Sequence, residues 1–514
     1  MSQWSGTLSP MLEPSLRSRN VFDIVPISLL IIGGAILYRS CLNGDFLADD
    51  FAYIQLYSRT KLSQFPSLFV NDWSQGIWGF NLGELRPLVG FTYWLEYRLW
   101  GVYPLGYHLT NLALYLLTLA GFYCVVRETA RTLLEKSVAK TAIGWIAIAA
   151  AILFLVHPVH VEATVWIAGR TDLLASCAWL WSLYCLLRFW QTGSSALCIC
   201  AIVIYAAGLF MKESVVTMPG AFVLYAGLEG SFISRWKRIV ATLPPLTGVM
   251  WLWITLRHKA FGGIGNVNFE ELSGRLAYYF TQILPLQGKI ALTILITSLM
   301  LCLIWSVIAW SRSGRFFLFW SLVWTALHLL PLSAVHYESS RHVFLLVAGP
   351  LVLLPAASAV AWKKHWLAGV TLLTLGAGLM FGLLKPTLKS LSEWERSARY
   401  SRQLTVLLNQ NDYPANSIVV FNSLPDVLTW YRHWSLPFAM EPPFVNLRAR
   451  YVSVWNWYCC DKPFQDSRVF LKELEAGVPQ QIYRIDFDAT QDRYISTEAK
   501  PPRNGETRFS GHFR

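Results

Sequence analysis

Two adjacent aspartates, Asp49 and Asp50, follow the first long apolar run of the chain, within the stretch FLADDFAYI that starts at Phe46. Neighbouring acids point in different directions, so one can accept a proton while the other fixes a ligand or a cation. The alternative is structural, because paired aspartates also cap a helix, here one expected from Phe51 to Arg59. The pair by itself specifies no reaction.

Two further motifs carry residue types that do chemistry. His157, His160 and Glu162 stand in the sequence HPVHVE, and such side chains can bind a metal ion. Because no second ligand pair stands out, histidines bonded to backbone or water are the competing interpretation. Lys212 and Glu213 interrupt an apolar stretch, where burying charges is costly, and the alternative there is an ion pair that stabilises a hairpin. No cofactor is certain, and a divalent metal stays an open alternative.

The composition indicates that the helices that position these residues lie in a membrane. The chain has 514 residues, of which 54% are hydrophobic and 14% charged, and its apolar residues fall in blocks. A bilayer core of about 30 Å needs about 20 apolar residues per helix, fewer when the ends snorkel. Eleven stretches qualify as transmembrane helices. They begin near Val21, Leu105, Thr141, Leu173, Ala196, Ser214, Ile239, Ile290, Phe316, Val343 and Trp366.

Basic residues orient these stretches, because Lys and Arg concentrate in short cytoplasmic loops. With a cytoplasmic N-terminus (1–20), which reads as part of an uncleaved signal anchor, the inner segments hold 14 basic residues in 60 positions. The outer segments hold 11 in 121 positions. The net charge of +12 therefore reflects topology and does not predict a nucleic-acid partner. We expect an integral protein of the bacterial inner membrane, with its C-terminus on the non-cytoplasmic side.

In this orientation the ionisable motif residues fall on the outer face. Charges that converge at helix ends on one face indicate a site. The alternative is that they solvate helix termini or pair with each other. The outer-face residues are Asp49, Asp50, Glu84, Arg86, His157, His160, Glu162, Arg170, Asp172, Lys212, Glu213, His336, Glu338, Arg341 and His342.

Three regions follow from this pattern. After the N-terminal segment comes a multi-span membrane domain (21–384) with a first outer loop (42–104). From 385 to 514 the charge is balanced and shorter apolar runs such as Ser417–Phe421 read as buried strands, which predicts a small extracytoplasmic α/β domain. The nine cysteines show no C-x-x-C spacing, which argues against a metal or disulfide framework. Of these cysteines, only Cys459 and Cys460 lie in a polar region.

Five pieces in register resemble the membrane half of the transmembrane and tetratricopeptide repeat (TMTC) family and its bacterial relatives, within the GT-C glycosyltransferase superfamily. They are Asp49-Asp50, Arg86-Pro-Leu88 with Tyr107-His-Leu-Thr-Asn111, His157–Glu162 with Gly169–Ala175, Lys212-Glu213, and Arg341 after Glu338. The resemblance implies a GT-C-like fold that transfers a sugar, with inversion, from a polyprenyl-phosphate carrier to an acceptor on the outer face. The acceptor is an unknown glycan, lipid or protein.

The resemblance also implies roles for the site residues. An acid of the first outer loop, Asp49 or Asp50, acts as the base, and cations opposite hold the departing lipid phosphate. Arginine binds phosphate through a bidentate fork, so Arg341, Arg170 and Lys212 are the phosphate candidates. The supporting residues are Glu84, Arg86, His157, His160, Glu162, Glu213, Glu338 and His342. The sequence departs from the family after Arg341 and lacks its tetratricopeptide repeats.

A transporter or flippase for a lipid-linked glycan is the competing function. Such a carrier places ionisable groups near mid-membrane and contains paired broken helices. The interiors of the predicted spans are almost free of charge. The charge distribution therefore favours an enzyme.

Overall fold

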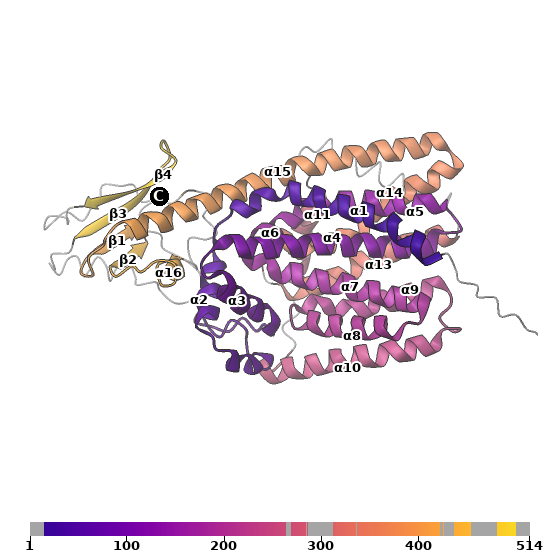
Figure 1. The fold of residues 1–514 in the computed structure, drawn as a ribbon, viewed down its shortest axis with the longest axis horizontal. Coiled ribbons are helices and arrows are strands. Elements are labelled where there is room, and N and C mark those ends of the chain that lie inside the picture. The colour runs from indigo at the N-terminus through magenta and orange to yellow at the C-terminus, as the bar shows by residue number, and fades with distance from the viewer. Residues whose placement is uncertain are drawn as a thin grey trace, which may run out of the picture.

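The structure is a computed structural model that describes residues 15–263, 269–283, 285, 312–335, 337–421, 425, 436–453 and 481–499. The span expected near Ile290 lies outside these residues, as do His336, Cys459 and Cys460. The described chain is mostly helical, with one small sheet near its C-terminal end (Figure 1).

Ten described helices coincide with ten of the eleven predicted apolar stretches. They are α1 (Ser15–Leu37), α4 (Pro104–Leu134), α5 (Lys140–Leu155), α7 (Arg170–Thr192), α8 (Ser195–Leu209), α9 (Met218–Glu229), α10 (Trp236–Phe261), α13 (Arg312–Leu329), α14 (Ala348–Lys364) and α15 (Trp366–Gln410). Proline and glycine mark helix ends here as they commonly do. Pro104 is the first residue of α4, and Gly193, at φ +75°, ends α7. The ten helices form a bundle around one apolar core.

Four described helices are long and apolar enough to cross a membrane, namely α4, the segment Ile167–Thr192, α10 and α15. A fifth span is obtained if α5 and α6 (Val159–Val165), which bend by 67°, count as one. Apolar side chains on two of these helices face outward, for example Trp251 at 68% and Phe381 at 64% exposure, as a lipid-facing surface requires. The chain is an integral membrane protein, and eleven crossings remain a prediction.

Shorter elements connect the long helices. The first outer loop holds η1 (Arg39–Asn43), α2 (Asp49–Arg59), η2 (Leu62–Phe69) and α3 (Pro87–Trp100). Other short elements are η3 (Ile167–Gly169), η4 (Glu213–Thr217), α11 (Phe269–Ile283), η5 (Leu330–Ala334) and η6 (Ser340–Val343). Figure 1 shows α2, α3 and the sheet at one end of the bundle and the α14–α15 connection at the other.

The C-terminal region contains a four-stranded sheet in the order β2-β1-β3-β4. The strands are β1 (Ile418–Phe421), β2 (Arg450–Ser453), β3 (Ile482–Asp488) and β4 (Arg493–Ala499), and α16 (Leu436–Ala439) lies between β1 and β2 in sequence. β1 pairs in parallel with β2 and β3, and β4 runs antiparallel to β3. The strand predicted at 417–421 is thus present as β1.

The domain boundary predicted at residue 385 falls inside α15, which runs without a break for 45 residues from the bundle to the sheet (Figure 1). A second apolar core joins the first outer loop to the C-terminal region, and it includes Phe46, Phe51, Trp73, Val419 and Ile485. The C-terminal region therefore packs on the loop that carries the aspartate pair.

Candidate functional site

A cavity of about 610 Å³ opens beside the start of α2. Its walls come from α2, the loop before α3, the α6–α7 junction, the segment before η6 and the middle of α15. The charged lining residues are Asp49, Glu84, Glu162, Glu338, Arg86 and Arg341. The outer-face residues of the sequence prediction thus contribute six side chains to one cavity.

Asp49 and Asp50 have different surroundings. The Asp50 carboxylate is fully buried and accepts hydrogen bonds from the backbone N–H groups of Leu47, at 2.9 Å, and Ala168, at 2.8 Å. Asp49 lines the cavity, and its carboxylate has no hydrogen bond or ion pair with any residue that the structure describes. Neither bond caps α2, which has no side-chain cap hydrogen bond among the described residues. Asp50 instead ties the start of α2 to η3, and Asp49 is the carboxylate open to a ligand.

Burial and neighbouring charges bring the pKa of Asp49 close to neutral pH. Burial raises its pKa, the Arg341 guanidinium lowers it and the nearby Glu84 carboxylate raises it again, which leaves the pKa of Asp49 at about 6. The carboxylate is therefore ionised at pH 7 and more basic than a free aspartate. These are the properties of a general base.

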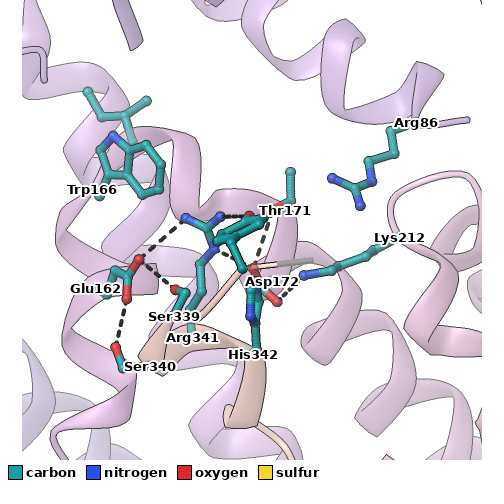
Figure 2. Close-up of polar contacts among 12 residues, drawn as sticks. Arg86, Glu162, Trp166, Thr171, Asp172, Lys212, Ser339, Ser340, Arg341 and His342 are labelled. Atoms are coloured by element: carbon teal, nitrogen blue, oxygen red, sulfur yellow. Dashed lines mark hydrogen bonds and ion pairs between the residues drawn. The ribbon is translucent and has the colours of Figure 1, made fainter. Parts of the chain in front are cut away.

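Arg341 also lines the cavity and is held from several sides (Figure 2). Its Nη1 lies 3.4 Å from Glu162 Oε1 and its Nε lies 3.3 Å from Asp172 Oδ2. The guanidinium also lies over the Trp166 ring, 4.7 Å from the centroid, and Nη2 donates to the Tyr337 hydroxyl. The contacts to Glu162 and Tyr337 use one N–H of each terminal nitrogen, which leaves the second N–H of Nη1 and of Nη2 for a ligand. Nε lies within ion-pair distance of Asp172 but forms no hydrogen bond with any described residue.

Glu162 fixes η6 and the residue before it. Its two carboxylate oxygens accept hydrogen bonds from the hydroxyls of Ser339 and Ser340, each at 2.7 Å (Figure 2). Glycine is required nearby, since a Cβ on Gly169 would approach the Ala163 Cα to 2.8 Å, so the glycine of the GRTD motif lets the α6–α7 junction close.

Three more ion pairs lie at the cavity or beside it. Lys212 Nζ lies 2.5 Å from Asp172 Oδ1, so Asp172 bridges Lys212 and Arg341 (Figure 2). Arg86 bonds Glu213 through two nitrogens, at 2.7 and 3.3 Å, and Glu84 at 2.9 Å. Burial opposes ionisation of Glu213, but the charge and hydrogen bonds of Arg86 hold its pKa at about 2. Arg86 thereby ties the first outer loop to η4.

Arg170 lies away from the cavity lining. It is fully buried, pairs with Glu96, and lies over the Tyr93 ring at 4.6 Å. Its Nε donates to the Ile167 carbonyl at 3.2 Å, beside the residue that binds Asp50. It is not among the residues that line the cavity. α7 points Arg170 and Asp172 in different directions, which a motif read along the chain does not reveal.

His157 and His160 contact backbone carbonyls, and His342 contacts a tyrosine hydroxyl. His157 Nε2 lies 3.0 Å from the Ile283 carbonyl, and the two ring nitrogens of His160 lie 2.7 and 3.2 Å from the carbonyls of Phe154 and Phe344. His342 Nδ1 lies 3.4 Å from the Tyr279 hydroxyl. In the part of the chain that the structure describes, no three His, Cys, Asp or Glu side chains are grouped to hold a metal ion.

Aromatic side chains form much of the remaining lining, and the sequence motifs did not single them out. Tryptophans and tyrosines cluster in the first outer loop, and this clustering could have indicated three of the lining residues, Tyr53, Trp73 and Trp78. Trp394 lies beyond the predicted domain boundary. The aromatic lining residues are Tyr53, Trp73, Trp78, Phe80, Trp166, Tyr278, Tyr337 and Trp394.

Comparisons with known proteins agree with the resemblance read from the motifs. No family model matches the chain. It is 28% identical over 233 residues to protein O-mannosyl-transferase F38B6.6 of Caenorhabditis elegans, covering 44% of this chain and 31% of that protein. To the O-mannosyl-transferases Tmtc1 and Tmtc2 of Drosophila melanogaster it is 29% and 31% identical, covering 40% and 38% of this chain and 23% and 21% of those proteins.

The chain thus spans less than a third of the length of these relatives. Their names confirm the predicted resemblance to the TMTC family of membrane glycosyltransferases. They are animal proteins, so the bacterial inner membrane stays a prediction. A crystal structure of ArnT from Cupriavidus metallidurans bound to undecaprenyl phosphate aligns with a TM-score of 0.42 and 12% identity, over 89% of this chain and 93% of that one. A score at this level does not establish a common fold.

Proposed function

We propose that this protein is a glycosyltransferase that moves a sugar from a polyprenyl-phosphate carrier to an acceptor hydroxyl on the outer face of the membrane. The observation that carries the proposal is the state of Asp49, a partly buried carboxylate in a cavity, without a protein partner among the described residues and with a pKa of about 6. The O-mannosyl-transferase relatives support the reaction class.

In the proposed reaction Asp49 takes the proton of the acceptor hydroxyl as its oxygen attacks the anomeric carbon. The bond between that carbon and the carrier's phosphate oxygen breaks, the configuration inverts, and polyprenyl phosphate leaves as the anion. Arg341 offers its two remaining N–H donors to that phosphate, because charge-assisted bonds stabilise the charge that develops there. Lys212 adds positive charge behind Asp172. Arg170 supports the turn that holds Asp50 and is not assigned to the phosphate.

The flippase alternative is less well supported. The relatives are named as transferases, and the ion pairs described above lie beside the cavity at helix ends. We keep the glycan, lipid or protein acceptor open, since the chain matches only part of its relatives.

The test uses purified full-length protein in detergent with labelled undecaprenyl-phosphate mannose, glucose, galactose and arabinose. The acceptor mixture is an envelope extract from cells that lack the protein. We expect one donor to give labelled product and free undecaprenyl phosphate, and Asp49→Asn to lower the rate of both by about 100-fold or more. Transfer that persists at the wild-type rate in Asp49→Asn would remove the proposed base. No transfer from any donor, combined with movement of a lipid-linked glycan across vesicles, would favour the flippase.

A further inference from the structure

The C-terminal region packs against the turn that carries Asp49. The Phe444 ring packs edge-on against Phe46, with centroids 5.3 Å apart, and against Phe51, at 4.8 Å. These two phenylalanines lie on either side of the aspartate pair in sequence. A single aromatic side chain from the far end of the chain therefore contacts both flanks of the base.

Hydrogen bonds reinforce this contact along the turn. On α15, the Ser401 hydroxyl donates to the Phe46 carbonyl at 2.7 Å, and Arg402 Nε bonds Asp45 Oδ2 at 2.8 Å. Further along α2, Gln55 Nε2 donates to Glu441 Oε2 and to the Pro442 carbonyl, each at 3.1 Å. Bonds before and after the aspartates limit both the position and the rotation of α2.

The residue that these contacts enclose is strained. Ala48 directly precedes Asp49 and adopts φ +52° and ψ −123°, a conformation that an L side chain rarely takes. Such strain persists only where the surroundings over-determine it. Ala48 is buried and lines the cavity, so its conformation sets the direction from which Asp49 enters.

We propose that Ser401, Arg402, Glu441, Pro442 and Phe444 form a C-terminal clamp that holds the strained turn at Ala48 and thereby aims Asp49 into the cavity. None of the five lines the cavity, so they are positioning residues. The inference rests on the proposed function of Asp49. It gives the C-terminal region a part in turnover that is separate from any contact with the acceptor.

The test is Phe444→Ala in the full chain, assayed with the labelled undecaprenyl-phosphate sugar that wild-type protein uses. We expect kcat to fall about 10- to 100-fold, because a base displaced by about 1 Å loses a rate factor of this order. The donor KM should change less than about 2-fold, because Arg341 is held by α6, α7 and the segment around η6. Phe487→Ala is the matched control, since Phe487 is also partly buried but packs on Tyr400 and Tyr494.

A rescue separates positioning from general damage. Glycine takes a positive φ without steric cost, so Ala48→Gly should need less help from the clamp. In the Phe444→Ala background, Ala48→Gly should restore kcat by at least about 3-fold, which a loss of folded protein would not allow. If Phe444→Ala folds poorly, Ser401→Ala removes one hydrogen bond with little loss of volume and should lower kcat in the same direction.

Three outcomes overturn the inference. They are wild-type kcat in both clamp variants while Asp49→Asn is inactive, an equal loss in Phe487→Ala, or a rise in donor KM without a fall in kcat. A different result, turnover retained in Asp49→Asn, would remove the proposed function itself. The two failures are therefore distinguishable in one set of assays.

Discussion

Two adjacent carboxylates have opposite environments, so the same substitution should have different effects on each. Asp49→Asn keeps shape and removes the base, and general-base catalysis is typically worth about 100- to 10,000-fold. We expect kcat to fall by that factor while the donor KM is nearly unchanged, measured by release of labelled sugar from the polyprenyl-phosphate donor. A matching loss of donor affinity would point instead to a binding role for Asp49.

Asp50→Asn should act on stability. Its two carboxylate oxygens each accept a backbone N–H, and an amide nitrogen placed there would face a donor. Leaving a buried donor unsatisfied costs about 1 to 3 kcal/mol, so the free energy of unfolding should fall by that amount. Thermal unfolding in detergent measures this. An Asp50→Asn protein that is stable and inactive would exchange the roles of the two residues.

The pKa of Asp49 also predicts the pH dependence. The base must be ionised, so the rate should fall as pH drops below about 6, and this acidic limb should be absent from the residual rate of Asp49→Asn. The folded pKa lies above the unfolded value of about 3.9, so ionised Asp49 destabilises the fold above pH 6. Asp49→Asn should thus unfold at a higher temperature than wild type at pH 7.5, and the difference should vanish by pH 4.

The sequence motifs identified the aspartate pair but did not show that the two carboxylates have different surroundings. Spacing gives the order of side chains and not the rotation of the backbone, and here the turn at Ala48 decides which carboxylate faces the cavity. Arg341 was predicted as a site residue and lines the same cavity as Asp49, whereas its neighbours Trp166 and Tyr337 were not among the predicted site residues. Cation–π and hydroxyl contacts between distant segments leave no periodic signal in a single sequence.

Between elements, the link from α6 to η6 offers a test of how Arg341 is positioned. Glu162→Ala removes the acceptor of two serine hydroxyls and one partner of Arg341, so η6 should loosen. Losing a charge-assisted bond costs about 1.5 to 3 kcal/mol, so the donor KM should rise about 10-fold or more. Glu128→Ala is the control, because Glu128 is a buried glutamate that pairs with Arg131 outside the cavity. Equal effects of both variants would show general damage.

Elements were predicted well where apolar length decides and poorly where tertiary packing decides. Ten apolar stretches are helices, and residue 385, where the sequence changes to balanced charge and shorter apolar runs, lies within α15, which continues through Pro386. Proline normally breaks a helix. Here Leu383 and Leu391 are buried in the bundle core and the Thr387 hydroxyl bonds the Val156 carbonyl at 2.6 Å, so packing carries α15 past the proline.

Across the whole molecule, the site and the sheet share one end and one apolar core, so the first outer loop and the C-terminal region should lie on the same side of the membrane. The positive-inside rule predicts that the other side, where the basic residues of the α14–α15 connection lie, is cytoplasmic. Alkaline phosphatase fused after Arg514 should therefore be active, and a cytoplasm-only reporter fused at Lys237 should also be active. Given normal expression, a silent reporter at either position contradicts this topology. It would also move Asp49 and Arg341 to the cytoplasmic face, where an outer-face acceptor is out of reach.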